Sequence, residues 1–164
     1  MQILDHRQIK QKIKRLAIQI LENNYDEPEI ILAGINNNGM AFAAILESEL
    51  LGITKIPIKL TRLKLNPANP ISSPVELELS ADKVANKAII IIDDVANTGR
   101  TIFYAFRPFM EVLPKKVEVA VLVDRKHKSF PIQVDYLGIS LATTLKEHIK
   151  VDISDKENYV VFLK

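Results

Sequence analysis

The stretch AIIIIDDVANTGRT, residues 88–101, constrains the fold of this chain more than any other segment. Its run of isoleucines is typical of a strand that is buried on both faces of a parallel sheet. Asp93 and Asp94 follow at once, and an unpaired carboxylate inside a core is very costly. We therefore expect the two acids at the carboxyl end of the strand, where α/β sheets bind ligands and where a carboxylate can meet water, a metal ion or ligand hydroxyls.

The residues after the acids, VANTGRT, are small, hydroxylated or flexible, and they precede a predicted helix. Backbone N–H groups at the start of a helix, together with the hydroxyls of Thr98 and Thr101, suit an anion such as phosphate. The Walker pattern G-x-x-x-x-G-K-[ST] is absent, and Gly99 alone does not make a dinucleotide-binding fingerprint. A buried strand, two acids and a cradle for one phosphate together indicate a sugar-phosphate ligand.

Helix and strand patterns alternate along most of the chain. We expect helices after Asp5, over residues 40–51, and from Thr98 or Gly99, with Pro108 kinking or shortening the last of these. Strands are expected over EIILAGI, KIPIKLTRLKL, AIIII, KVEVAVLVD, IQVDYLG and YVVFLK. This order predicts one α/β domain, residues 1–164, with a mainly parallel sheet flanked by helices. The Pro-rich segment from about residue 62 to residue 80 is expected to project as a long excursion.

Composition excludes several kinds of site. The 164 residues contain 22 Lys and Arg against 20 Asp and Glu, and this balance does not favour a general attraction to nucleic acid or membranes. Cysteine is absent, which excludes disulfides, thiolate nucleophiles and cysteine-based zinc sites. No apolar run approaches the roughly 20 residues of a membrane helix, and the charged N-terminus lacks the apolar core of a secretory signal. We therefore expect a cytoplasmic protein.

IIIIDDVANTGRT closely resembles the phosphoribosyl pyrophosphate (PRPP) motif of the type I phosphoribosyltransferases: four apolar residues, two acids and a T-G-x-T turn. ILAGINNNGMAFAAILESEL resembles the first strand, loop and helix of that family. VAVLVDRKHKSFPIQVDYLGISLATT resembles its pyrimidine-operon attenuation regulators, which are also uracil phosphoribosyltransferases, although DYLG alone is also similar to the 6-oxopurine enzymes. The resemblance implies the type I phosphoribosyltransferase fold, with a flexible lid over about residues 62–80 and a small base-recognising hood over about residues 124–145.

The same resemblance implies transfer of a 5-phosphoribosyl group from PRPP to a nucleobase, with uracil as the best single candidate, and release of pyrophosphate. Mg²⁺ is the implied cofactor, held near Asp93 and Asp94 through the ligand or water. The implied catalytic residues are Asp93, Asp94 and Arg62. The implied binding residues are Ala96, Asn97, Thr98, Gly99, Arg100 and Thr101 for the 5′-phosphate, Asn36, Asn37, Asn38 and Gly39 for pyrophosphate, and Arg125, Gln133, Asp135 and Tyr136 for the base.

Three departures from the subgroup leave alternatives open. The pyrophosphate loop reads NNNG where the subgroup carries Thr-Arg before its glycine, so this loop brings no positive charge. The lid begins TRLK instead of Y-R-D-D, which keeps Arg62 but loses both acids, and Gln133 replaces a basic residue. A purine phosphoribosyltransferase, an RNA-binding regulator that senses nucleotides at the same site, and a non-catalytic binding domain remain alternatives. Members of the family are commonly dimers, so a homodimer is expected.

Overall fold

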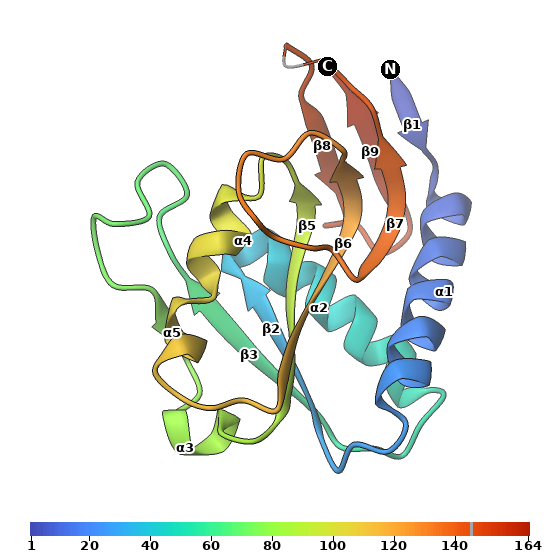
Figure 1. Ribbon diagram of the computed structural model, residues 1–164. Coiled ribbons are helices and arrows are strands. Elements are labelled where there is room, and N and C mark those ends of the chain that lie inside the picture. The colour runs from blue at the N-terminus through green and yellow to red at the C-terminus, as the bar shows by residue number, and fades with distance from the viewer. Residues whose placement is uncertain (145) are drawn as a thin grey trace.

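β5 (Ala88–Ala96) lies inside a six-stranded sheet with the order β4-β3-β2-β5-β6-β7 (Figure 1). This computed structural model describes residues 1–144 and 146–164. All neighbouring strands in the sheet are parallel except β3 and β4, which are antiparallel. The other strands of this sheet are β2 (Ile30–Ile35), β3 (Ile58–Lys64), β4 (Glu76–Leu77), β6 (Lys116–Arg125) and β7 (Tyr136–Leu141).

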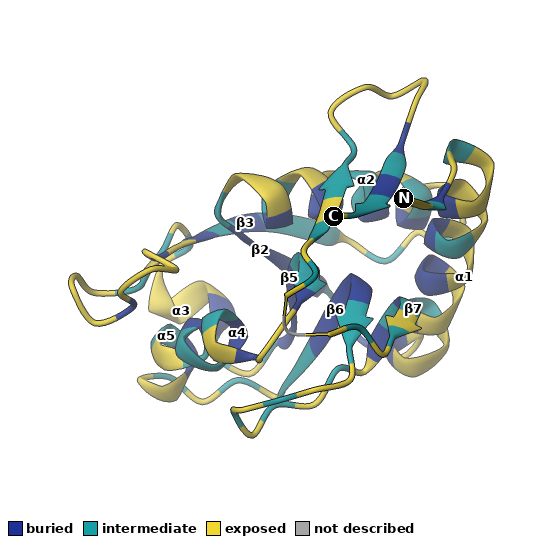
Figure 2. Cartoon of the chain, turned by 90° about the horizontal axis from the view of Figure 1, so that it is seen from above, coloured by how far each residue is buried: buried dark blue, intermediate teal, exposed yellow. Residues whose placement is uncertain are grey.

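Helices cover both faces of the sheet because its central strands are apolar on both sides. Along β5, Ile90 packs in the cluster formed with α1 and α2, whereas Ile91 packs in the cluster on the opposite face with α4 and α5. Figure 2 shows the buried strands between these two layers. The helices are α1 (His6–Asn24), α2 (Asn36–Leu51), α3 (Ala81–Val84), α4 (Arg100–Ala105) and α5 (Arg107–Met110).

Local sequence signals set the ends of several helices. Asp5 caps α1, since its side chain accepts a hydrogen bond from the backbone N–H of Gln8 at 2.9 Å while the Gln8 side chain accepts one from the N–H of Asp5 at 3.0 Å. The single helix expected from Gly99 onward is two short helices, α4 and α5, that meet at Phe106. Pro108 lies in the first turn of α5, where its missing N–H removes no helical hydrogen bond.

A second, antiparallel sheet stands above the carboxyl ends of β5 and β6 (Figure 1). It has the order β1-β9-β8, so it joins the two ends of the chain. Its central strand, β9, matches the predicted YVVFLK strand, whereas β1 and β8 were not expected from the sequence. The last residue of the expected hood, Leu145, lies outside the described residues. The three strands are β1 (Gln2–Leu4), β8 (Ile149–Asp152) and β9 (Val160–Leu163).

The excursion, residues 62–80, leaves the edge of the large sheet (Figure 1). β3 and β4 pair antiparallel where Leu63 faces Leu77, and the chain between them projects away from the domain. Its role as a lid stays a prediction. Within residues 1–144 and 146–164, no helix combines the length and the apolar character needed to cross a membrane.

Candidate functional site

A cavity of about 420 Å³ opens at the carboxyl ends of β2 and β5. It brings together the acid pair, the pyrophosphate loop (residues 36–39), part of the phosphate loop (residues 96–101) and the excursion. The cavity therefore joins segments that lie far apart in sequence, such as residues 36–38 and residues 93–94. Its lining residues are Ile35, Asn36, Asn37, Asn38, Pro67, Asp93, Asp94, Val95, Asn97, Thr101 and Ile149.

The acid pair lies within β5, which continues to Ala96 instead of ending at Ile92 as expected. One carboxylate oxygen of Asp93 accepts a hydrogen bond from the backbone N–H of Asp94 at 2.9 Å, and one of Asp94 accepts from Val95 N–H at 2.8 Å. Burial, and then the neighbouring Asp94 carboxylate, raise the pKa of Asp93 well above its usual range. None of the ion pairs among the described residues involves either acid, so both carboxylates keep acceptor capacity for a ligand.

The phosphate loop turns sharply between β5 and α4. Gly99 has a φ of 88°, a left-handed backbone that favours glycine, and a Cβ there would lie only 2.7 Å from Cγ1 of Ile132. The carbonyl of Thr98 accepts backbone hydrogen bonds from Ser129 and Phe130 at 2.9 and 3.2 Å. Residues after β6 therefore hold the loop, which places Asn97 and Thr101 on the cavity wall while Ala96 is buried.

The pyrophosphate loop forms the first turn of α2, which begins at Asn36 and not at Met40 as predicted. Gly39 is buried and packs closely on β5, because a Cβ at this position would lie 2.5 Å from the carbonyl oxygen of Ile92. This close approach places the loop next to the acid pair. Asn37 and Asn38 are exposed at its tip and line the cavity.

Two arginines connect the loops around the cavity. Arg62, on β3, donates a hydrogen bond through Nη1 to Oδ1 of Asn37 at 2.6 Å. Arg100, at the start of α4, donates through Nη2 to the carbonyl of Pro67 at 2.6 Å. Arg62 thus contacts Asn37 in the cavity wall, and Arg100 contacts Pro67 in the excursion.

Arg125, at the end of β6, is also close to the phosphate loop. Its guanidinium donates to Oγ1 of Thr143 at 2.7 Å, to Oδ1 of Asn97 at 3.3 Å, and to the carbonyl of Thr144. All three acceptors are neutral, so they orient the guanidinium without cancelling its charge. Arg125 lines a neighbouring cavity of about 260 Å³ together with Asn97, Thr98, Lys126, His127, Ala142 and Thr143.

The structure does not bring Gln133, Asp135 and Tyr136 to this cavity. β7 begins at Tyr136, which pairs with Ala120 in the middle of β6, and Ala120 pairs with Ile92 on β5. Tyr136 therefore lies two strands away from β5, at the level of the residue before the acid pair. The expected strand IQVDYLG starts too early, so DYLG is the entry of β7 and not its exit. None of the three residues lines the cavity, and the base-binding roles expected for them stay predictions.

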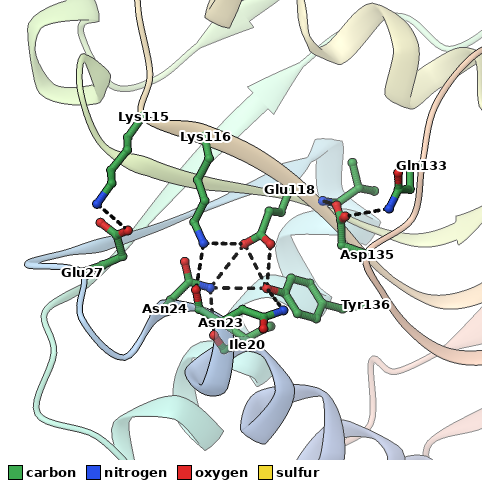
Figure 3. A network of polar contacts seen from close by, with 11 residues as sticks. Ile20, Asn23, Asn24, Glu27, Lys115, Lys116, Glu118, Gln133, Asp135 and Tyr136 are labelled. Atoms are coloured by element: carbon green, nitrogen blue, oxygen red, sulfur yellow. Dashed lines mark hydrogen bonds and ion pairs between the residues drawn. The ribbon is translucent and has the colours of Figure 1, made fainter.

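These residues belong to a separate network of polar contacts instead (Figure 3). The hydroxyl of Tyr136 lies 2.9 Å from both carboxylate oxygens of Glu118, and it accepts a hydrogen bond from the side chain of Asn23 at 3.1 Å. Burial raises the pKa of the Tyr136 phenol. The Asp135 carboxylate accepts the N–H of Val119 at 2.8 Å and lies 3.4 Å from the Gln133 amide nitrogen. The network binds β7 to α1 and β6.

Sequence reasoning assigned no site role to four residues of the cavity wall, Ile35, Pro67, Val95 and Ile149. Ile35 and Val95 directly adjoin predicted site residues, whereas Pro67 and Ile149 come from other segments. Ile149 belongs to β8, whose four residues gave too short an alternating pattern for a strand prediction. Pro67 lies in the excursion, which was expected to cover the site without a contact being assigned. For β8, the alternating apolar residues Ile149, Val151 and Ile153 were the signal in the sequence that could have predicted a strand.

The acid pair suits Mg²⁺ only with help from a ligand. Among the described residues, no group of three or more His, Asp or Glu side chains gathers to hold a metal ion. Mg²⁺ needs about six oxygen ligands and commonly takes one or two carboxylates together with phosphate oxygens and water. The donor set of Asp93 and Asp94 therefore fits Mg²⁺ that arrives with a phosphorylated ligand.

Nearly the whole chain is similar to known proteins. A family model described as phosphoribosyl transferase domain matches residues 1–156. Bifunctional protein PyrR from Caldicellulosiruptor saccharolyticus is 31% identical over 98% of this chain and 93% of the relative. Bifunctional protein PyrR from Streptococcus pneumoniae is also 31% identical, over 96% of this chain and 92% of the relative.

Solved structures confirm the predicted fold class. A hypoxanthine-guanine phosphoribosyltransferase from Bacillus anthracis matches with a TM-score of 0.71 at 21% identity, over 87% of this chain and 84% of that one. A hypoxanthine phosphoribosyl transferase from Trypanosoma cruzi matches with a TM-score of 0.73 at 18% identity, over 98% and 90% of the two chains. At these identities the likeness shows the fold alone.

Proposed function

The chain belongs to the phosphoribosyl transferase family and is an enzyme of that class, and from this premise we propose that it transfers a 5-phosphoribosyl group from PRPP to uracil. The observation that carries the proposal is the single cavity shared by the acid pair, the pyrophosphate loop and the phosphate loop. PRPP has a ribose, a 5′-phosphate and a pyrophosphate, and each of these has a matching segment in the cavity wall.

In the proposed reaction a ring nitrogen of uracil forms a bond to C1 of the ribose as the C1–O bond to pyrophosphate breaks. The electron pair of the broken bond leaves with pyrophosphate, and the ring nitrogen loses its proton to solvent. Asp93 and Asp94 accept hydrogen bonds from the ribose hydroxyls, and their charge stabilises the positive charge that develops on the ribose. Backbone N–H groups and the threonine hydroxyls of the phosphate loop hold the 5′-phosphate.

Mg²⁺ is the proposed cofactor, because the donor set described above fits it only together with ligand oxygens. When bound, it would supply charge neutralisation on the pyrophosphate group. Asn37 and Asn38 would donate amide hydrogen bonds to the same group, and Arg62 would add a positive charge from β3. The excursion would act as the lid that excludes water during the transfer.

Uracil is supported by the resemblance of residues 119–144 to the pyrimidine-operon regulators and by the 31% identity to two PyrR proteins. A direct test incubates the protein with PRPP, Mg²⁺ and one base at a time, chosen from uracil, hypoxanthine, guanine and adenine, while released pyrophosphate is measured. We expect the largest kcat/KM with uracil. Turnover with a purine alone would overturn the assignment of uracil but keep the reaction. PRPP binding without turnover of any base would favour the non-catalytic alternative.

We propose RNA binding as a second function, favoured by the basic wall of the neighbouring cavity. Lys126 and His127 are exposed there, and Arg125 carries a charge that no carboxylate pairs with among the described ion pairs. Arg125 also contacts Asn97 of the phosphate loop, so a nucleotide in the site would alter this surface.

The test of RNA binding measures the affinity for a pyrimidine-operon leader transcript at several salt concentrations, with and without uridine monophosphate. We expect affinity to fall steeply with salt, because phosphate contacts release counterions. Lys126→Gln should lower the salt dependence by about one counterion. Absence of binding at low salt would remove RNA as a partner.

A further inference from the structure

Asn36 makes two hydrogen bonds to the backbone of one distant residue. Its side-chain Nδ2 donates to the carbonyl of Leu65 at 2.9 Å, and its Oδ1 accepts the N–H of Leu65 at 3.1 Å. Asn36 has a φ of 52°, a left-handed backbone that asparagine adopts more readily than most residues with a side chain. The carboxamide therefore satisfies both backbone groups of Leu65, as a neighbouring strand would.

Leu65 lies at the root of the excursion. It follows the last residue of β3 and is only 6% exposed, whereas residues 66–69 are all exposed. In the parallel pairing of β2 with β3, Ile35 faces Leu63. The Asn36 side chain thus extends this ladder beyond the point where the two backbones separate. The freely projecting part of the excursion begins after Leu65.

Further contacts join the same segments. Arg62, three residues before Leu65, contacts Asn37 of the pyrophosphate loop, and Arg100 of the phosphate loop contacts Pro67. The pyrophosphate loop itself carries no charged residue. An anion at this loop would therefore depend on a cation brought from elsewhere, and Arg62 is already hydrogen-bonded to it.

We propose that Asn36 is a positioning residue that couples the pyrophosphate loop to the excursion. A pyrophosphate group held by Asn37 and Asn38 fixes the first turn of α2, and through Asn36 it fixes Leu65, Arg62 and the root of the excursion. Closure of the excursion then retains the anion in a loop that has no charge of its own. This inference rests on the proposed function for the identity of the anion, whereas the link between Asn36 and the excursion does not.

The test compares Asn36→Asp with Asn66→Asp as a matched control. Both variants make the same change and add one negative charge. Only Asn36 lines the cavity, where its charge would also repel pyrophosphate directly, so the cleavage rates of the ligand-free proteins decide the coupling. Asn36 uses its amide as donor and acceptor, so aspartate loses the bond to the Leu65 carbonyl. Asn66 only accepts, from the N–H groups of Ala68 and Asn69 at 3.0 and 3.4 Å, and an aspartate can still accept both bonds. Asn36→Gly, which relieves the positive φ, serves if Asn36→Asp does not fold.

Two measurements report on the coupling. Limited proteolysis of the ligand-free protein measures how often residues 66–75 open. Tryptophan fluorescence measures closure, because the chain has no tryptophan and Ile71, at 71% exposure, accepts a single Trp probe in the excursion. Inorganic pyrophosphate with Mg²⁺ is the titrant in wild-type, Asn36→Asp and Asn66→Asp backgrounds, each carrying Ile71→Trp.

We expect Asn36→Asp to be cleaved about tenfold faster, to bind pyrophosphate about tenfold more weakly and to lose the fluorescence change, since one hydrogen bond to a partly buried group is worth about a factor of ten. Its kcat/KM for PRPP should fall by a similar factor while KM for the base stays unchanged, and Asn66→Asp should match wild type. Equal cleavage rates for Asn36→Asp and wild type would overturn the coupling. If neither wild type nor Asn66→Asp binds pyrophosphate, the proposed role of the pyrophosphate loop fails. The cleavage rates then still decide whether Asn36 holds the root of the excursion.

Discussion

The two ends of the parallel sheet carry polar side chains in opposite states. At the amino end, Glu118 is held by Tyr136 and lies 3.4 Å from the ammonium of Lys116, while Asp135 accepts the N–H of Val119 (Figure 3). At the carboxyl end, the hydrogen bonds that Asp93 and Asp94 accept from the described residues come from the N–H groups of the residues that follow them. The amino-end carboxylates are paired by the protein, whereas the carboxyl-end carboxylates keep acceptor capacity facing a cavity.

This difference suggests that the polar residues at the amino end have a structural role and that the acids at the carboxyl end have a functional one. A buried polar group whose partners are all within the protein holds elements together, and its removal costs stability. A partly buried acid with a raised pKa and few partners beside a cavity is typical of a functional site. The amino end should therefore respond to substitution through stability, and the carboxyl end through activity.

The largest effect is expected at Asp94. Asp94→Asn removes a charge that lines the cavity without changing the size of the side chain, so it should lower kcat/KM for PRPP at least about a hundredfold. Pyrophosphate release with uracil and PRPP measures the loss, and urea denaturation checks that the free energy of unfolding stays within about 1 kcal/mol of wild type. Full activity in this variant would remove the acid pair from the reaction.

The next effect is expected in stability at Tyr136. Tyr136→Phe deletes the hydroxyl that contacts Glu118 and Asn23, and it leaves partly buried partners unsatisfied. The free energy of unfolding should fall by about 1–3 kcal/mol in urea denaturation, because a lost partner of a buried polar group costs about this much. At 25 °C kcat/KM should stay within about twofold of wild type, since the residue lies away from the cavity. A large loss of activity without a loss of stability would show that the amino end takes part in the reaction.

A smaller effect is expected in how the stability of the Asp93→Asn variant, relative to wild type, depends on pH. Burial and Asp94 raise the pKa of Asp93, so the folded protein holds this proton more tightly than the unfolded chain does. The resulting stabilisation is full below the roughly pH 3.9 of a free aspartate, and it is lost as the pH rises through the folded-state value. Asp93→Asn cannot ionise and should be more stable than wild type at pH 7.

Urea denaturation of the ligand-free proteins at pH 4, 5.5 and 7, without Mg²⁺, measures this dependence. The stability advantage of Asp93→Asn should shrink as the pH falls toward 4. An advantage of constant size across this range would contradict a raised pKa as its cause. Tyr136→Phe gives the comparison from the amino end, because its loss of stability should change little between pH 5.5 and pH 7, above the ordinary range of carboxylate titration.

The smallest effect is expected at Gln133. Its side chain is exposed and lies 3.4 Å from Asp135, so Gln133→Ala should change the free energy of unfolding by less than about 0.5 kcal/mol. Its kcat/KM and its preference among bases should stay within about twofold of wild type in the pyrophosphate assay. A changed base preference would restore the base-reading role that the sequence suggested.

The segment that we expect to bind the ribose and its phosphate was recognisable because its residues are contiguous. Asp93 to Thr101 form one strand–turn–helix unit, and local patterns are enough to recognise such a unit. Another part of the cavity wall was not predictable, because Ile149 reaches the cavity from a second sheet whose strands come from both ends of the chain. Periodicity also gave β7 the wrong start, because the strand begins at Tyr136 and Gln133 and Asp135 lie in the segment before it.

The start of α2 shows a similar limit. Asn36, Asn37 and Asn38 have low intrinsic helix propensity, so the sequence predicted a loop there. Asn36 is hydrogen-bonded to Leu65, just after β3, and Asn37 to Arg62 on β3, and these contacts hold the segment as the first turn of the helix. Tertiary contacts between distant segments decided this boundary, and no local pattern carries that information.

Hydrogen exchange of the backbone amides, with and without PRPP and Mg²⁺, tests the contrast between the two ends most directly. We predict slower exchange on binding in residues 36–39 and 93–101, and unchanged exchange in residues 116–119 and 133–136. Protection of the amino-end residues, or exchange in residues 93–101 that PRPP does not slow, would contradict the placement of the active site at the carboxyl end of β5.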